Sequence, residues 1–181
     1  MSSTGWYALL LAAVAAERVA ELVVSTRHVR VALGRGGVES GRGHYPLMVA
    51  LHTGLLLGAL LEVVLLNRPF FGWLGWPMLA LVCAAQALRW WCIATLGWHW
   101  STRVVVVPGE PLVTAGPYRW LRHPNYLAVV VEGLALPLVH TAWLTAAVFT
   151  TLNLPLLGVR IRCEDRALGR GQSGAGEGLG R

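Results

Sequence analysis

Long apolar runs constrain the fold of this chain more than any other feature of its sequence. A helix needs about 20 mainly apolar residues to cross the roughly 30 Å hydrocarbon core of a bilayer. The chain is 55% hydrophobic and 13% charged, whereas soluble domains average about 25% charged residues. One small core cannot bury so much apolar surface, so we expect an integral membrane protein. Three runs are each long enough for one span: residues 6–24, 46–66 and 71–96.

A fourth apolar run, residues 125–159, is too long for a single span. Pro137 and His140 interrupt it, and proline disfavours a continuing helix. We therefore expect a tight helical hairpin over about 125–139 and 142–162. Together these segments predict an all-α, polytopic membrane protein of about five transmembrane helices, in which helices 4 and 5 form the hairpin.

Arginine placement predicts how the helices cross the membrane. The chain has no lysine, and its arginines concentrate after the first and third runs and in the tail, whereas the segment after the second run has only Arg68. Cytoplasmic segments are enriched in arginine. We therefore expect an odd number of spans, with the N-terminus outside and the C-terminus in the cytoplasm. We also expect a single membrane domain over residues 1–168 and a disordered, glycine-rich tail over residues 169–181.

Other functions are disfavoured by the same residues. The formal net charge of +6 does not indicate nucleic-acid binding, because the arginines do not gather on a polar face with interleaved aromatics. The three cysteines include no CxxC pair, so neither a disulfide framework nor a zinc site is expected. His52 and Glu62 lie ten residues apart on one predicted helix, but a metal ion would need a third ligand that we do not find. The sequence does not indicate an oligomeric state.

The stretch TAGPYRWLRHPNY, residues 114–126, places polar and rigid residues directly before the fourth helix. Pro124 suits the first turn of a helix, and the residue before it, His123, is restricted to an extended conformation. The free N–H groups of such a first turn can bind an anion. Asn125 and Tyr126 add an amide and an aromatic ring. The same pattern also fits a plain proline-capped helix with interfacial aromatics and arginines, and the residues alone do not separate the two interpretations.

A second group of charged residues, RIRCED, ends the fifth predicted helix at residues 160–165. Arg160 and Glu164 are four residues apart and therefore share one helix face. They are suited to one ligand that carries both an anionic group and an amine. The alternative is an interfacial ion pair, which contributes only a few tenths of a kcal/mol.

Taken together, LVTAGPYRWLRHPNY, two helices and RIRCED resemble the isoprenylcysteine carboxyl methyltransferase (ICMT) family of integral membrane enzymes, over roughly residues 86–168. The resemblance implies S-adenosylmethionine as methyl donor and a lipid substrate that contacts Arg160. Glu164 suits the ammonium of the donor, and His123 or the helix N-terminus suits its carboxylate. The donor-binding residues that the resemblance implies are Glu110, Pro111, Leu112, Val113, Tyr118, His123, Pro124, Asn125, Tyr126 and Glu164.

Two departures from the family pattern concern the C-terminal end. The second acid of the motif is Asp165 rather than glutamate, and glycines follow where the family has a short aromatic, amphipathic tail. The segments RHPNYLAVVVEGLALPL and TAWLTAAVFTTLNLPLL are most similar to a bacterial branch associated with type III polyketide synthases. That branch implies a phenol or enol acceptor of the alkylresorcinol or alkylpyrone type; an isoprenylcysteine-like carboxylate is a further acceptor. The alternatives are a phospholipid N-methyltransferase, an NADPH-dependent membrane reductase and a non-catalytic membrane scaffold.

Glu132 is the acidic residue that lies deepest in the fourth predicted helix. A charge at that depth costs on the order of 2.5–3.5 kcal/mol on insertion scales and so marks a functional candidate. Glu132 is suited to act as the general base that takes the proton of a phenol or enol. It is equally suited to pair with Arg89 of the third helix as a packing contact, and both interpretations stay open.

Overall fold

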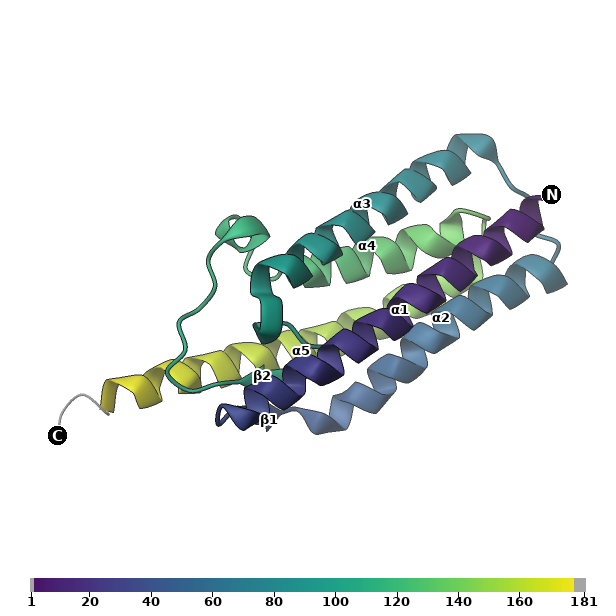
Figure 1. The fold of residues 1–181 in the computed structure, drawn as a ribbon. Helices are drawn as coiled ribbons and strands as arrows, with labels where there is room; N and C mark the ends of the chain where they lie inside the picture. The colour runs from purple at the N-terminus through teal and green to yellow at the C-terminus, as the bar shows by residue number, and fades with distance from the viewer. Residues whose placement is uncertain (1, 178–181) are drawn as a thin grey trace.

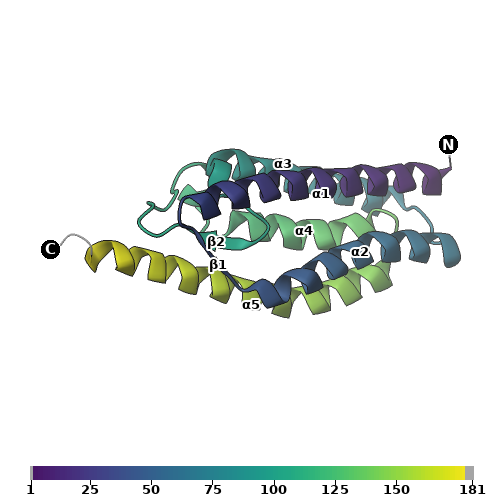
Figure 2. The same cartoon turned by 60° about the horizontal axis from the view of Figure 1, so that its bottom comes forward.

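The computed structural model describes residues 2–177, without the side chains of residue 42 and of residues 170–177. Its helices run alternately up and down in one elongated bundle (Figure 1). The N-terminus lies at one end, and the loops between α3 and α4 lie at the other (Figures 1 and 2). The elements in chain order are α1 (Ser3–Gly34), β1 (Val38–Ser40), η1 (Arg42–His44), α2 (Tyr45–Leu65), α3 (Gly72–Leu96), η2 (Gly97–His99), β2 (Val104–Val106), η3 (Gly116–Arg119), α4 (Pro124–Leu138) and α5 (Trp143–Glu177).

Three of the helices are long and apolar enough to cross a membrane within the part of the chain that the structure describes. They correspond to α2, α3 together with η2, and the first 27 residues of α5. α4 is apolar but only 15 residues long. α1 is long, at 32 residues, but it carries Glu17, Arg18 and Glu21 in its middle. The predicted helices are present, whereas a count of five full spans stays a prediction for α1 and α4.

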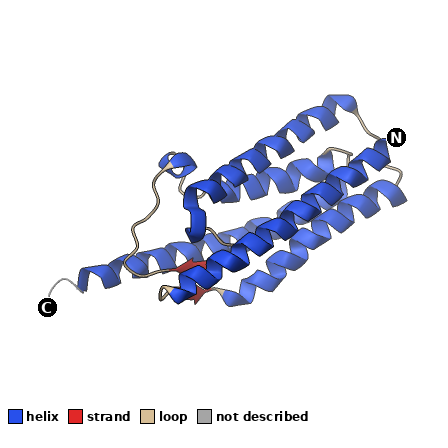
Figure 3. Cartoon of the chain, in the orientation of Figure 1, coloured by secondary structure: helices blue, strands red, loops and turns tan. Residues whose placement is uncertain are grey.

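Two short strands are the one departure from an all-helical fold in the described residues (Figure 3). β1 and β2 pair antiparallel, with Val38 opposite Val106 and Ser40 opposite Val104. The prediction of an all-α chain holds for most of the described residues but did not include these two strands, the second of which lies in a run of four valines at residues 104–107. The pair joins the segment after α1 to the segment after α3.

The break between α4 and α5 falls where the sequence predicted it. α4 ends at Leu138 and α5 begins at Trp143, and Thr141 adopts a positive φ of 55° in the turn. Glu62 of α2 holds the start of α5, because its carboxylate accepts hydrogen bonds from the backbone N–H groups of Leu144 (3.1 Å) and Thr145 (2.7 Å). A carboxylate at a helix N-terminus also interacts favourably with the helix dipole.

α5 extends further than the predicted helix end at about residue 162 and past the predicted domain boundary at residue 168. Its backbone continues as helix to Glu177 and projects beyond the bundle (Figure 2). The last four residues, 178–181, lie outside the described residues, so a disordered tail stays a prediction there.

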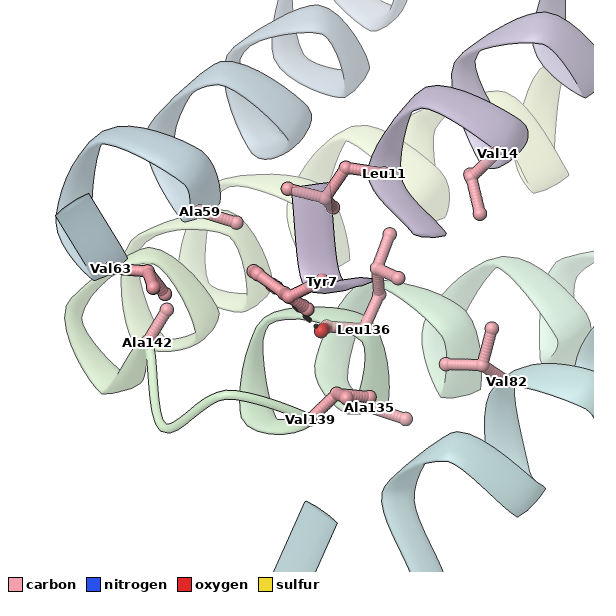
Figure 4. Close-up of a cluster of buried hydrophobic side chains, with 10 residues drawn as sticks. All are labelled: Tyr7, Leu11, Val14, Ala59, Val63, Val82, Ala135, Leu136, Val139 and Ala142. Carbon is pink, nitrogen blue, oxygen red and sulfur yellow. Dashed lines mark hydrogen bonds between the residues drawn. The ribbon is translucent and has the colours of Figure 1, made fainter. Parts of the chain in front are cut away.

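The hydrophobic core lies toward the end that contains the N-terminus and the α4–α5 turn (Figure 4). Tyr7 of α1 is fully buried, and its hydroxyl donates a 3.0 Å hydrogen bond to the carbonyl of Leu136 in α4. This contact gives the phenol the partner that a buried hydroxyl needs. The core therefore fixes α1 against α4 at this end of the bundle. Its members are Tyr7, Leu11, Val14, Ala59, Val63, Val82, Ala135, Leu136, Val139 and Ala142.

Candidate functional site

A cavity of about 320 Å³ opens at the loop end of the bundle. Its walls come from the loop after β2, from the first turn of α4 and from the second half of α5. The two charged motifs of the sequence therefore face one space, although about 35 residues separate them in the chain. Nine of the ten predicted donor-binding residues line the cavity, as does Arg160: Glu110, Pro111, Leu112, Val113, Tyr118, His123, Asn125, Tyr126, Arg160 and Glu164.

Tyr126 links α4 to α5 in the wall of this cavity. Its hydroxyl donates a hydrogen bond to Oε2 of Glu164 and accepts one of 2.9 Å from Nε of Arg160. Arg160 and Glu164 thus share a face of α5, as their spacing predicted. The phenol lies between them, so a carboxylate and a guanidinium are held in fixed positions on one side of the cavity.

His123 contributes a second contact between the same two helices. Its ring stacks on Tyr126 with centroids 5.4 Å apart. Its Nε2 lies 3.2 Å from Oδ1 of Asp165, and its Nδ1 lies 3.9 Å from Oε1 of Glu164. Pro124 follows it as the first residue of α4; it is buried and does not line the cavity. The proline fixes where the helix begins, which places the imidazole between the two acids.

Arg160 is buried, with 5% of its surface exposed. No carboxylate lies within ion-pair distance of it in the described part of the chain. Besides Tyr126, it contacts Met48 of α2, with Nη1 3.0 Å from Sδ. A buried charge without a counter-ion is costly, so this guanidinium is suited to an anionic ligand group.

The opposite wall of the cavity is the stretch Glu110–Val113, together with η2. His99 of η2 lies 3.9 Å from Glu110, measured from Nε2 to Oε2. Three buried polar atoms of the lining residues have no hydrogen-bond partner among the described residues: Nε2 of His99, Nε1 of Trp100 and Oδ1 of Asn125. Buried polar atoms are rarely left unpaired in native proteins, so these atoms are available to a polar ligand.

Tyr118 and Gly116 hold the loop against α3. Burial, and then the neighbouring Cys92, raises the pKa of the Tyr118 phenol, which therefore stays protonated. Gly116 has φ +55°, and a Cβ there would lie 2.5 Å from Oγ1 of Thr95. Only glycine fits this approach, which explains the glycine of the GPY turn. The GPY turn also positions Tyr118 in the cavity wall.

The model of the isoprenylcysteine carboxyl methyltransferase (ICMT) family matches residues 78–170. That range includes every residue of the two motifs and half of the chain. The chain belongs to the isoprenylcysteine carboxyl methyltransferase family. The sequence resemblance is therefore confirmed at the level of the family, and membership of the family indicates a membrane methyltransferase.

Two relatives extend this similarity over most of the chain. The uncharacterized protein YpbQ of Bacillus subtilis is 40% identical over 161 residues, which cover 88% of this chain and 95% of the relative. An uncharacterized protein of Haemophilus influenzae is 27% identical over 163 residues, which cover 88% of this chain and 93% of the relative. No solved structure matches the chain.

Glu132 is the one predicted catalytic residue that this ICMT-family fold does not place in the cavity wall. It is buried, and its Oε2 lies 2.5 Å from Nη2 of Arg89. Of the two interpretations that the sequence left open, the structure displays the ion pair with Arg89. A role as general base has no support in this geometry, because its carboxylate is already engaged by a guanidinium.

The cavity also contains residues that sequence reasoning did not assign. His99, Arg122 and Asp165 line it, and Met48 contacts Arg160 from α2. Arg122 and Asp165 are adjacent in sequence to the predicted residues His123 and Glu164. Their positions in the two motifs could therefore have predicted that they line the cavity. Met48 had none, because only the packing of α2 on α5 brings it to the site.

Proposed function

We propose that this protein is an S-adenosylmethionine-dependent methyltransferase that acts on a lipophilic acceptor at the cytoplasmic face of the membrane. The observation that carries the proposal is the contact chain Arg160–Tyr126–Glu164 in the wall of one cavity. It holds a cationic group and an anionic group side by side at one membrane end of the bundle. Family membership supports methyl transfer as the reaction.

The side chains of the cavity fit the charged groups of S-adenosylmethionine. Glu164 and Asp165 are suited to its ammonium, whereas His123 and the free N–H groups of the first turn of α4 are suited to its carboxylate. The unpartnered Oδ1 of Asn125 and Nε2 of His99 are suited to its hydroxyl and base nitrogen groups. When bound, S-adenosylmethionine supplies an electrophilic methyl group.

The remaining residues act on the acceptor. Arg160 binds the oxygen that takes the methyl group and keeps it anionic, because an adjacent guanidinium favours the charged form of an acid. Tyr126 fixes the guanidinium through its 2.9 Å hydrogen bond. Alignment of the two reactants and exclusion of water then account for most of the acceleration. We favour a long-chain phenol or enol as acceptor, for which no separate base such as Glu132 is needed once the oxygen is ionised.

Arginines at the loop end support the orientation in this proposal. Exposed arginines occur near the end of α1 and in the loops around the cavity: Arg27, Arg30, Arg35, Arg103, Arg119 and Arg122. The N-terminus lies at the opposite end (Figure 1). With arginine-rich segments in the cytoplasm, the cavity faces the cytoplasm, where S-adenosylmethionine is made, and the N-terminus faces outside.

An apolar groove between α2 and α5 supports a lipophilic acceptor. It has a volume of about 550 Å³ and lies along the seam that continues to Met48 and Arg160. Gly54 lines the groove, and a Cβ at this position would meet no atom within 4 Å. We propose that the hydrocarbon chain of the acceptor lies in this groove while its oxygen meets Arg160.

Gly54→Leu should therefore raise the KM of a long-chain acceptor about tenfold or more, because the new side chain removes the apolar contacts of several CH₂ groups. A short-chain acceptor with the same head group should keep its KM. Ala12→Leu, on the exposed surface of α1, is the matched control. An equal rise for both chain lengths would place the chain elsewhere.

The direct test is methyl transfer by the purified, lipid-reconstituted protein with labelled S-adenosylmethionine. The panel of acceptors comprises an alkylresorcinol, an alkylpyrone, an isoprenylcysteine and a phosphatidylethanolamine. We expect labelled ether from the alkylresorcinol or the alkylpyrone. Label only in the phospholipid would identify an N-methyltransferase. Protection of the protein against heat by NADPH but not by S-adenosylmethionine would indicate the reductase, and binding of neither would indicate a scaffold.

A further inference from the structure

A second polar site lies inside the bundle, away from the cavity. It joins the middle of α1 to α3 and α4. Its charged members are Glu17, Arg18, Glu21, Arg89 and Glu132, and Gln86 and Trp90 contribute polar hydrogens. Glu132 lies six residues beyond Tyr126 on α4, which is about 9 Å further along the helix axis. The cluster thus lies deep in the bundle, between the cavity and the hydrophobic core.

Two arginines hold two of the acids together. Arg18 contacts Glu21 at 2.7 Å and Glu132 at 3.5 Å. Arg89 contacts Glu132 at 2.5 Å and Glu21 at 3.6 Å. Both carboxylates therefore lie within reach of the same pair of guanidiniums, and they lie close to each other. Two carboxylates that share one site do not both ionise easily.

The third acid, Glu17, is satisfied by neutral donors. Gln86 donates to its Oε2 and Trp90 donates to its Oε1. It also lies 3.7 Å from Arg18. With both oxygens accepting hydrogen bonds, Glu17 is the acid that is best prepared to carry a negative charge.

The charges of this cluster do not balance. Three carboxylates face two guanidiniums, which leaves one negative charge among the described residues of the cluster if every acid is ionised. An uncompensated charge is costly inside a bilayer. The charges of the cluster also act on His52 of α2. The ring of His52 packs edge-on against Phe149, and its Nδ1 lies 2.8 Å from the carbonyl oxygen of Met48. No carboxylate of the described chain is within ion-pair distance of His52, so a charged imidazole there would lack a direct partner.

We propose that the cluster is a proton-binding site and that Glu21 carries the proton at neutral pH. Glu21 is buried, with only 3% of its surface exposed. Its Oε1 is buried and accepts no hydrogen bond within the described structure. Glu132, in contrast, accepts the shortest contact of the cluster, 2.5 Å from Arg89. The proton on Glu21 makes the cluster neutral, which lets the charged middle of α1 stay inside the membrane. This inference is independent of the methyl-transfer function.

Infrared spectroscopy of the full-length protein in lipid tests the proposal. At neutral pH the wild type should show the C=O stretch of a protonated carboxylic acid, with the shift to lower frequency in D₂O. Glu21→Gln should remove this band. Glu62→Gln should retain it, because Glu62 is a buried acid outside the cluster whose oxygens accept several hydrogen bonds. A wild type without the band, or a band that survives Glu21→Gln, overturns the proposal.

Thermal unfolding provides a second measurement that does not depend on the spectrum. A glutamine resembles a protonated glutamate but takes up no proton on folding, so Glu21→Gln should match the Tm of the wild type at acid pH and exceed it at pH 7. In the proposal Glu21 binds a proton in the folded state that it has released in the unfolded state at neutral pH, so the stability of the wild type should fall as pH rises from the acid range toward neutrality. Glu21→Gln should lack this decline. A lower Tm for Glu21→Gln at pH 7, or a wild type that is stabilised by Na⁺ but not by choline, would show that Glu21 is ionised and disprove the proposal.

Discussion

Glu164→Gln is expected to weaken S-adenosylmethionine binding by roughly 10- to 100-fold, because a hydrogen bond to a charged group contributes about 1.5–3 kcal/mol. The glutamine keeps the size of the side chain but removes the negative charge that faces the ammonium of the donor. Glu164 also accepts the hydroxyl hydrogen of Tyr126, and a glutamine oxygen can still accept it. The change therefore tests the charge more than the packing. Isothermal titration of the purified protein with S-adenosylmethionine measures the effect.

Two further variants serve as controls for this measurement. Asp165→Asn changes the neighbouring acid, which is more exposed and contacts His123 at 3.2 Å, so it should weaken binding less than Glu164→Gln. Arg162→Gln changes an exposed residue that does not line the cavity, and it should leave binding unchanged. If Glu164→Gln binds the donor as tightly as the wild type, the donor site does not lie against α5.

Arg160→Lys should reduce kcat/KM for methyl transfer by about 10²- to 10³-fold, the usual effect of removing one group that stabilises a reacting oxygen. Lysine keeps the positive charge but cannot reproduce the planar fork of arginine. It therefore loses the fixed position that Nε gains from the hydroxyl of Tyr126. Binding of S-adenosylmethionine should stay close to the wild type, because Glu164 and His123 remain in place.

The combination of these two results separates the roles of the two residues. We expect steady-state kinetics to show the loss for Arg160→Lys and titration to show intact donor binding. Tyr126→Phe gives an intermediate test, since it removes the hydroxyl that holds the guanidinium but leaves the ring. It should lower kcat/KM less than Arg160→Lys does. A fully active Arg160→Lys would mean that this guanidinium does not contact the acceptor.

The sequence predicted the helices well because their signals are local. The length of an apolar run identifies a membrane helix, and Pro137 lies one residue before the end of α4. The meeting of Tyr126 with Glu164 was also predictable, since a hairpin returns α5 to the end where α4 began. The family resemblance supplied the prediction that Glu110–Val113 contribute to the site, for which the residues alone gave no signal; the structure places them in the cavity wall.

Contacts between helices that are distant in sequence were beyond the same reasoning. Nothing in the local sequence pairs Val38 with Val106 or brings Met48 to Arg160. Glu132 shows most clearly what the sequence cannot predict, because a buried acid is equally consistent with a catalytic role and with a packing contact. The structure shows the 2.5 Å contact with Arg89 that the packing interpretation requires.

The β1–β2 ribbon has a consequence for the biogenesis of the protein. Its two strands flank α2 and α3, so the ribbon closes only after both of these helices have been inserted as a hairpin. A chain in which only one of these two helices crosses would leave the strands on opposite faces of the bilayer. The ribbon can therefore close only in a chain that has the correct membrane topology, and only such a chain brings together the loops that form the cavity.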